Sequence, residues 1–171
     1  RHKLTGRSWA DSLGGLGARL AAALSGTLVC VLGSPDDPTS GAIARRLREA
    51  GVEFKPVRVP DMPADWTLMI TSGEHGDTLA VGFRGCNAAI SPDALDGHAV
   101  IPCELQVVGG LPNALAAQLF QSTGARIRLF APTMSNMLDR DVPVSAFASG
   151  IDLLCCDRNK WEALEDRESV G

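Results

Sequence analysis

Short apolar runs alternate along this chain with segments that have the spacing of amphipathic helices, and this alternation restricts the fold more than any other feature of the sequence. Residues 28–32 are apolar at every position, which is typical of a strand covered on both faces. The pattern predicts, in chain order, helix 17–24, strand 28–32, helix 40–50 capped by Ser40, a strand within 100–108, helix 111–121, strands 127–130 and 151–155, and a last helix from Asn159. Strands separated by helices in this way predict an α/β fold with a mostly parallel sheet and helices on its faces.

Residues 52–84 have a different character. The segments 52–59 and 66–84 look like strands exposed on one side, and the second contains Gly73-Glu74-His75-Gly76-Asp77, whose composition indicates a hairpin turn. We expect both segments to form a small β lid outside the core sheet. Because an exposed strand edge is a template for another strand, a homodimer through this lid is also expected.

Size, charge and cysteine content exclude several classes of protein. The 171 residues are enough for one domain, so 1–171 is treated as a single unit. The net charge is −4 and the 16 Lys and Arg residues form no basic block, so nucleic acid is not expected as a partner. No apolar run is long enough for a membrane span, and no secretory leader is recognisable. Five cysteines without a Cys-x-x-Cys pair indicate reduced thiols and a cytoplasmic location, and the scattered His2, His75 and His98 form no metal cluster.

Common nucleotide-binding and hydrolase motifs are not found in the sequence. All three lysines are followed by Leu, Pro or Trp, so there is no Walker loop. Residues 15–17 begin like a dinucleotide fingerprint, but Leu20 occupies the third glycine position and no clear strand precedes the segment. Neither a Gly-x-Ser-x-Gly nor a His-Glu-x-x-His motif occurs.

Four other segments combine glycine, acidic or amide residues with the ends of predicted elements. Residues 14–21 place Gly14 and Gly15 directly before a helix, where flexible backbone and unpaired N–H donors suit a ligand, although tight packing also accounts for such a loop. Residues 33–41 carry two aspartates and lead into the next helix. Residues 85–92 follow the predicted hairpin, and Asn159-Lys160-Trp161-Glu162 follow the last strand.

In this order and spacing, the four segments resemble the ribokinase-like carbohydrate kinases, the PfkB family. Residues 14–21 are similar to that family's Gly-Gly-x-Gly-Ala-Asn-x-Ala sugar-binding signature, with Arg19 in place of the asparagine. Residues 33–41 are similar to its Gly-x-Asp-Asp-x-x-Gly turn, and 85–88 to the segment after its lid strands. Asn159 and Glu162 resemble the motif that helps to place magnesium and the ATP phosphates. The resemblance implies a three-layer αβα fold with a mostly parallel sheet and a small β lid, of which the C-terminal part is missing here.

The resemblance also implies an activity, the transfer of the γ-phosphoryl group of ATP to a hydroxyl of a sugar, sugar phosphate or nucleoside. Gly14, Gly15 and Arg19 would line the acceptor pocket, and the lid would exclude water. Asn159 and Glu162 would act at the ATP phosphates, Glu162 through water bound to Mg²⁺. Arginine offers only donors and carries charge, so Arg19 indicates either a phosphorylated or acidic acceptor or a sugar site that has decayed. A solvated acid in the first turn of a helix is the other interpretation of Glu162.

The family's Gly-x-Gly-Asp motif, which carries the catalytic base, has no counterpart in 1–171 except Gly76-Asp77 in the predicted turn. We therefore assign no catalytic residue to this chain. It is expected to supply the acceptor-binding half of a kinase and to be inactive alone. The alternative is a non-catalytic ligand-binding or assembly module on the same fold, and a third hypothesis, a dinucleotide-dependent oxidoreductase, would require NAD binding.

Overall fold

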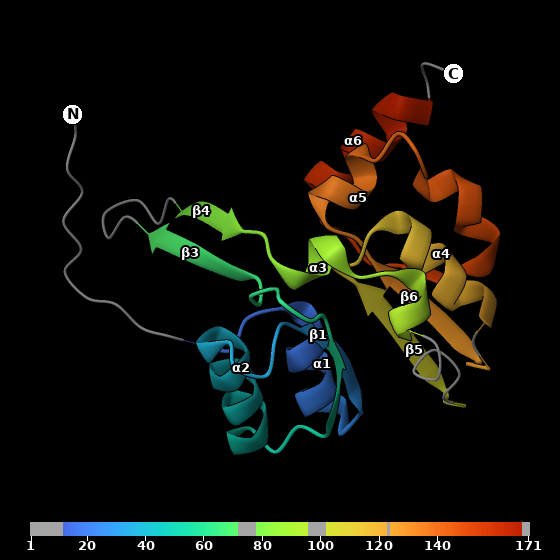
Figure 1. Ribbon diagram of the computed structural model, residues 1–171. Helices are drawn as coiled ribbons and strands as arrows, with labels where there is room; N and C mark the ends of the chain where they lie inside the picture. The colour runs from blue at the N-terminus through green and yellow to red at the C-terminus, as the bar shows by residue number, and fades with distance from the viewer. Residues whose placement is uncertain (1–11, 72–77, 96–101, 123, 169–171) are drawn as a thin grey trace, which may run out of the picture.

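The computed structural model describes residues 12–71, 78–95, 102–122 and 124–168 (Figure 1). The elements follow the chain in the order α1 (Leu16–Leu24), β1 (Leu28–Leu32), α2 (Pro38–Glu49), β2 (Phe54–Arg58), β3 (Trp66–Thr71), β4 (Thr78–Phe83), α3 (Cys86–Ala89), the 3-10 helix η1 (Pro92–Leu95), β5 (Leu105–Gly109), α4 (Asn113–Ser122), β6 (Ile127–Ala131), α5 (Met134–Leu138), the 3-10 helix η2 (Val144–Gly150), β7 (Leu153–Leu154) and α6 (Arg158–Glu168). Within these ranges every helix is too short or too polar to cross a bilayer.

The strands of the described residues form three separate sheets. β1 and β2 pair in parallel, with Val31 opposite Val57. β5, β6 and β7 form a second parallel sheet in that order. β3 and β4 form an antiparallel hairpin that projects away from the other elements (Figure 1). The α/β arrangement with mostly parallel strands, predicted from the alternation of helices and strands, is confirmed.

Strand β1 is covered on both faces, as its uniformly apolar sequence predicts. Leu28 and Cys30 pack with α1, α2 and the start of β2 in a small hydrophobic cluster. Val29 and Val31, which point to the opposite face, pack against the main core of the protein. One strand therefore joins two apolar layers, and its position is fixed from both sides.

The segment 52–59, expected in the lid, lies elsewhere in the structure. β2 pairs with β1 over its whole length, and Val57 belongs to the main core. Its neighbours Lys55, Pro56 and Arg58 are exposed, which is the reason for the half-polar pattern. Pro56 has no N–H to donate, and prolines are tolerated in edge strands. The polar pattern thus reflects the edge position of β2, and the antiparallel hairpin is formed by residues within 66–84 alone. The turn residues 73–77, including His75 and Asp77, lie outside the described residues.

The hairpin β3–β4 has one continuous apolar face. Side chains of directly opposed residues share a face, and the register pairs Trp66 with Phe83, Leu68 with Val81 and Ile70 with Leu79. The rings of Trp66 and Phe83 stack with centroids 3.8 Å apart. All six side chains are nevertheless exposed. The hairpin therefore presents an apolar surface that no described part of the chain covers.

The second sheet is held by an aromatic cluster from three elements. Phe130 of β6 is fully buried and makes edge contacts with Phe120 of α4 and Phe147 of η2, at centroid distances of 5.9 Å and 5.5 Å. Leu115 and Leu119 of α4 are buried in the same core, as the spacing of residues 111–121 predicts. This packing fixes α4 and η2 on the sheet, and with them the loops at its edge.

Candidate functional site

Two glycines, Gly14 and Gly15, directly precede α1 at the edge of the sheet where the parallel strands end. Only Ser25, Gly26 and Thr27 separate α1 from β1, so the helix runs back along the strand and its N-terminus lies at the carboxyl end of β1. Gly15 is the N-cap residue and has φ 90°, a conformation that favours glycine. A Cβ at Gly14 or Gly15 would meet no atom within 4 Å. The turn therefore offers open backbone and free helix N–H groups in the place where α/β proteins bind ligands.

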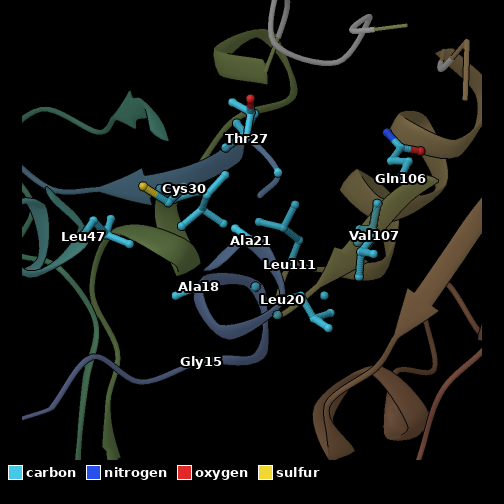
Figure 2. Close-up of a pocket in the computed structure, with 18 of the residues that line it drawn as sticks. Gly15, Ala18, Leu20, Ala21, Thr27, Cys30, Leu47, Gln106, Val107 and Leu111 are labelled. Atoms are coloured by element: carbon cyan, nitrogen blue, oxygen red, sulfur yellow. The ribbon is translucent and has the colours of Figure 1, made fainter. Parts of the chain in front are cut away.

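This turn borders a cavity of about 770 Å³ that extends between β1 and β5 (Figure 2). At the carboxyl ends of the two strands, its lining includes Gly14, Gly15, Asp65, Asn87 and Gly110. The carboxylate of Asp65, the amide group of Asn87 and the exposed backbone of the glycine turn therefore line the same concave surface. Such a set suits a small polyhydroxylated ligand, because the carboxylate accepts hydrogen bonds and the amide both donates and accepts.

Asp65 is held in this cavity by the start of α3. Its Oδ1 atom accepts hydrogen bonds from the backbone N–H groups of Gly85 at 2.9 Å and Asn87 at 3.1 Å. The chain can approach this closely because position 85 is glycine, where a Cβ would lie 2.3 Å from the carbonyl oxygen of Pro63. The side chain of Asp65 and the backbone of Asn87 are consequently fixed relative to each other.

A second aspartate, Asp37, holds the backbone of Ala64, a residue that lines the cavity. The Oδ2 atom of Asp37 accepts from the N–H of Ser40 at 2.8 Å and from the N–H of Ala64 at 2.9 Å. Asp37 is thus the N-cap of α2, and the prediction that Ser40 caps this helix is wrong, because the helix begins at Pro38 and buries Ser40. Burial acts to raise the pKa of Asp37, but the N–H donors of Ala64 and Ser40 outweigh it and hold the pKa below its usual range.

A pair of buried asparagines organises the loops after β5 and β6. Nδ2 of Asn136 donates to Oδ1 of Asn113 at 2.7 Å and to the carbonyl oxygen of Leu111 at 2.7 Å. Nδ2 of Asn113 donates to the carbonyl oxygens of Asn136 and Val142, both at 2.8 Å. No local sequence pattern indicates this pair, because the two residues are 23 positions apart in the chain.

A second, smaller hollow of about 250 Å³ lies at the base of the hairpin. Asp65, Trp66, Phe83 and Gly110 contribute to its lining, so it shares Asp65 and Gly110 with the large cavity. Nη2 of Arg84 donates to Oγ of Ser135 at 3.1 Å, which ties the residue after β4 to α5. The stacked rings of Trp66 and Phe83 therefore stand beside the mouth of the large cavity.

Comparisons with known proteins identify the fold of the chain. No protein-family model matches the chain. A curated relative, the ATP-dependent ribose-1-phosphate kinase of Halopiger xanaduensis, is 29% identical over 170 residues, which cover 96% of this chain and 57% of the relative. The ribokinase from Giardia lamblia superposes with a TM-score of 0.72 at 19% identity, covering 98% of this chain and 58% of the ribokinase. The nucleoside kinase of Burkholderia thailandensis, solved in complex with inosine, gives a TM-score of 0.74 at 14% identity, covering 99% and 56%.

The chain has the ribokinase fold. The resemblance to ribokinase-like carbohydrate kinases, first indicated by four short segments, is confirmed by these similarities. The chain spans a little over half the length of the curated relative that it matches.

Within this ribokinase fold, the predicted site residues fall in different places. Gly14 and Gly15 line the large cavity, whereas Arg19, one turn further along α1, is exposed and is not part of the lining. Asn159 and Glu162 are exposed at the start of α6, which follows β7. They lie outside both cavities, and Oε1 of Glu162 accepts from Nε of Arg158 at 2.7 Å.

The Gly14–Gly15 turn and the pair Asn159 and Glu162 lie at the same edge of the ribokinase fold, but they are not in contact. α6 begins after the carboxyl end of β7, and β6 separates β7 from β5, whose end borders the cavity. Among the residues that the structure describes, no three His, Cys, Asp or Glu side chains are grouped so that they could hold a metal ion. The structure therefore brings Gly14 and Gly15 to Asp65 and Asn87, and leaves Asn159 and Glu162 on a neighbouring part of the edge.

Proposed function

We propose that this chain forms the acceptor-binding part of an ATP-dependent kinase that phosphorylates a hydroxyl group of a sugar, a sugar phosphate or a nucleoside. The observation that carries the proposal is the position of the Gly14–Gly15 turn, which opens on a cavity at the carboxyl ends of two parallel strands. Ligands of α/β sheets bind at this edge. The similarity to a relative named as an ATP-dependent ribose-1-phosphate kinase supports the same class of reaction.

A phosphorylated sugar fits the start of α1, which borders the cavity, better than a neutral sugar does. The free N–H groups at the start of α1 and the dipole of the helix favour an anionic group. Arg19 adds a cation on the first turns of the same helix, although in the present conformation its side chain faces solvent. Asp65 and Asn87 would accept hydrogen bonds from the sugar hydroxyls. An acceptor with a phosphate at one end and hydroxyls at the other matches this arrangement.

The hairpin would serve as a lid over this acceptor. Its base, formed by Trp66 and Phe83, stands at the mouth of the cavity and places apolar rings where water would otherwise enter. Water competes with the acceptor hydroxyl in phosphoryl transfer, so exclusion of water favours the productive reaction.

ATP and Mg²⁺ are the cofactors that this reaction requires. Mg²⁺ usually keeps several waters and is held by one or two carboxylates together with substrate phosphates. The described residues fit this requirement, since Glu162 offers one exposed carboxylate whose pairing with Arg158 is a weak surface interaction. Asn159 and Glu162 would contact the metal–phosphate group through water, and the metal would neutralise charge on the phosphates.

Isothermal titration calorimetry of the full chain tests acceptor binding. Ribose 1-phosphate, ribose and inosine are titrated, and ribose 1-phosphate is expected to bind most tightly. Gly15→Ala should weaken this binding about tenfold or more, because an alanine resists φ 90° and displaces the N–H groups of the turn. Gly51→Ala is the matched control, since Gly51 has φ 67° with open space around it at the far end of α2. Absence of binding for all three ligands, or equal effects of the two variants, would contradict the proposal.

The second candidate is a non-catalytic ligand-binding module on the same fold, which the solvent-facing position of Arg19 favours. Titration with Mg²⁺ and ATP separates the two candidates. The kinase proposal requires nucleotide binding that weakens in Glu162→Gln, with Glu165→Gln as a control one turn further along α6. The module requires acceptor binding alone.

A further inference from the structure

The hollow of about 250 Å³ at the base of β3 and β4, which we call the hairpin hollow, contains a positive charge that the large cavity lacks. Among the described residues that line the two cavities, Arg84 is the only lysine, arginine or histidine. Arg84 directly follows β4 and precedes Gly85, whose N–H group binds Asp65. The cation therefore lies next to the segment that holds the carboxylate shared by both cavities.

The guanidinium group of Arg84 is held on one side and is otherwise available to a ligand. Its Nη2 atom donates to Oγ of Ser135 at 3.1 Å, so the side chain reaches from the hairpin to α5. A guanidinium group has five N–H donors, and this bond uses one of them. Among the ion pairs of the described residues, none involves Arg84. A cation without an anionic partner therefore borders the hollow.

Asp65 also lines the hairpin hollow but does not neutralise this cation. Its Oδ1 atom accepts from the N–H groups of Gly85 at 2.9 Å and Asn87 at 3.1 Å, which bind the carboxylate to the start of α3. The guanidinium group of Arg84 is bound to α5 instead. The hollow thus offers a hydrogen-bond acceptor on Asp65 and a cation on Arg84, a combination that suits a ligand with both hydroxyl groups and an anionic group.

The hydroxyl groups of the lining differ in what they can donate. The hydroxyl of Thr133 donates to Oδ1 of Asn136 at 2.7 Å, so its proton is already used within α5. The hydroxyl of Ser135 accepts from Arg84 and donates to none of the described residues. A serine hydroxyl is at once donor and acceptor. Ser135 can therefore hold the guanidinium group and donate to the same anionic ligand.

The aromatic pair at the base of the hairpin strengthens an interaction with Arg84. Trp66 and Phe83 line the hollow beside Arg84, and their rings stack with centroids 3.8 Å apart. Apolar rings displace water from this side of the hollow. Attraction between opposite charges grows as the surrounding water is removed, so an anion in the hollow is bound more strongly than one on an open surface.

We infer that the hairpin hollow is a phosphate subsite, in which Arg84 binds a phosphate group of a substrate and Ser135 positions the guanidinium group. The planar guanidinium group can donate two parallel N–H bonds to one phosphate. The inference deepens the proposed function and rests on it for the source of the phosphate, which is either a phosphorylated acceptor or ATP. It assigns the phosphate a cation on the hairpin, in addition to the N–H groups at the start of α1.

The subsite itself is tested by NMR titration of the full chain with inorganic phosphate. The backbone N–H signals of Ser135 and Gly110, which line the hollow, should shift in a saturable way, and Arg84→Gln should abolish these shifts. Arg58→Gln is the matched control. Arg58 is an exposed arginine outside both cavities that donates to one neighbouring oxygen, the carbonyl oxygen of Gly33 at 3.0 Å. Absence of saturable shifts in the wild type, or equal shifts in Arg84→Gln, would overturn the inference.

Calorimetry of the same variants identifies the source of the phosphate. If it belongs to the acceptor, Arg84→Gln should weaken the binding of ribose 1-phosphate by about tenfold to a hundredfold and leave the binding of ribose unchanged. If it belongs to the nucleotide, the same loss should be found for ATP with Mg²⁺ and not for AMP. Ser135→Ala keeps the cation and should weaken binding by no more than about threefold.

The comparison of phosphorylated and unphosphorylated ligands separates a phosphate contact from a purely structural role of the bond between Arg84 and Ser135. A structural role predicts equal losses for ribose and ribose 1-phosphate and equal effects of Arg84→Gln and Ser135→Ala, and either result would overturn the inference. Binding of ribose 1-phosphate and ATP that Arg84→Gln leaves unchanged would overturn the subsite but not the proposed kinase. Phosphate shifts that depend on Arg84, without binding of any sugar or nucleotide, would support the subsite and contradict the kinase.

Discussion

The side-chain amide of Asn136 donates to Oδ1 of Asn113 at 2.7 Å, and each of these asparagines also donates to backbone carbonyl groups of the loops around it. Asn113 begins α4 after β5, and Asn136 lies in α5 after β6. Thr133 adds its N–H and its hydroxyl group as donors to Oδ1 of Asn136, at 2.8 Å and 2.7 Å. The two loops that border the edge of the second sheet are therefore joined by one buried network in which the amide groups of both asparagines are bonded.

Replacement of Asn113 by leucine tests this network. Asn113→Leu removes two donated hydrogen bonds and leaves the buried carbonyl group of Asn136 and the partly buried one of Val142 without this donor. We expect the free energy of unfolding to fall by about 3 kcal/mol, measured by urea denaturation. Asn159→Leu is the control, because Asn159 is exposed and its replacement should change stability by less than about 0.5 kcal/mol. Equal losses in the two variants would show that the network does not stabilise the loops.

The glycine at position 85 is required by a close approach of two backbone segments. A Cβ at this position would lie 2.3 Å from the carbonyl oxygen of Pro63, a rigid neighbour that cannot move alone. Gly85→Ala should displace the start of α3 and break the hydrogen bonds to Asp65, with a loss of about 2–4 kcal/mol by thermal or urea denaturation. Gly82→Ala, where the nearest atom to a Cβ is 4.0 Å away, should be close to neutral. An unaffected Gly85→Ala would contradict the described approach.

The capping aspartate of α2 predicts a dependence of stability on pH. Burial opposes ionisation of Asp37, but the N–H donors of Ala64 and Ser40 hold its pKa below the usual range. A carboxylate with a depressed pKa in the folded state stabilises the protein above the pKa of the unfolded chain, and this contribution is lost as the pH falls through the folded value. The wild type should therefore be more stable than Asp37→Asn at neutral pH, and the difference should shrink in acid.

Unfolding by urea at a series of pH values measures this difference. Asp36→Asn, which removes the same charge from an exposed neighbour, is the control for the net charge of the chain. A difference between the wild type and Asp37→Asn that stays constant from neutral to acidic pH would rule out the carboxylate as its source.

The spacing of apolar residues predicted most strands and helices of the two parallel sheets, because it shows which face of each element is buried. The uniform apolar run at 28–32 gave a covered strand, and Leu115, Leu119 and Phe120 gave the inner face of α4. The pattern misplaced 52–59, because an edge strand of a buried sheet exposes polar residues such as Lys55 in the same way as a lid strand does. The periodicity of a strand shows which of its faces is buried, but it does not show whether the strand lies at the edge of its sheet or between two other strands.

The candidate site was only partly predictable, for a related reason. Gly14 and Gly15 carry a local signal, a glycine turn at a helix start, and they line the cavity. Asp65 carries none, and Asn87 lies in the 85–88 segment that resembles the family but was assigned no role, because the two residues meet through a hydrogen bond between segments 22 residues apart. The cavity between β1 and β5 was not predicted either, since it depends on which strands are neighbours.

The apolar face of the hairpin predicts self-association. Leu79 is 56% exposed on a face made entirely of large apolar side chains, and such surfaces mark interaction sites. Light scattering should give the mass of a dimer for the wild type and of a monomer for Leu79→Lys. Leu138→Lys is the matched control, because Leu138 is 55% exposed on α5, and it should leave the dimer intact. A monomeric wild type would contradict dimerisation through the lid.

The cysteines predict a difference in thiol reactivity that reports on the large cavity. Burial, helped by the neighbouring Cys86 and opposed by Arg58, raises the pKa of Cys30 from 9.0 to about 11. At pH 8 the thiolate fraction of Cys30 is therefore about 100-fold lower than that of an ordinary thiol, and the thiolate is the species that reacts with iodoacetamide. Cys155, which is exposed, should be alkylated first, and Cys30 more slowly, as measured by peptide mass spectrometry over time.

Raising the pH from 8 to 10 should accelerate modification of Cys30 nearly 100-fold, because its thiolate population continues to grow up to about pH 11. A rate for Cys30 that equals that of Cys155 at pH 8 would show that water reaches the interior of the cavity freely.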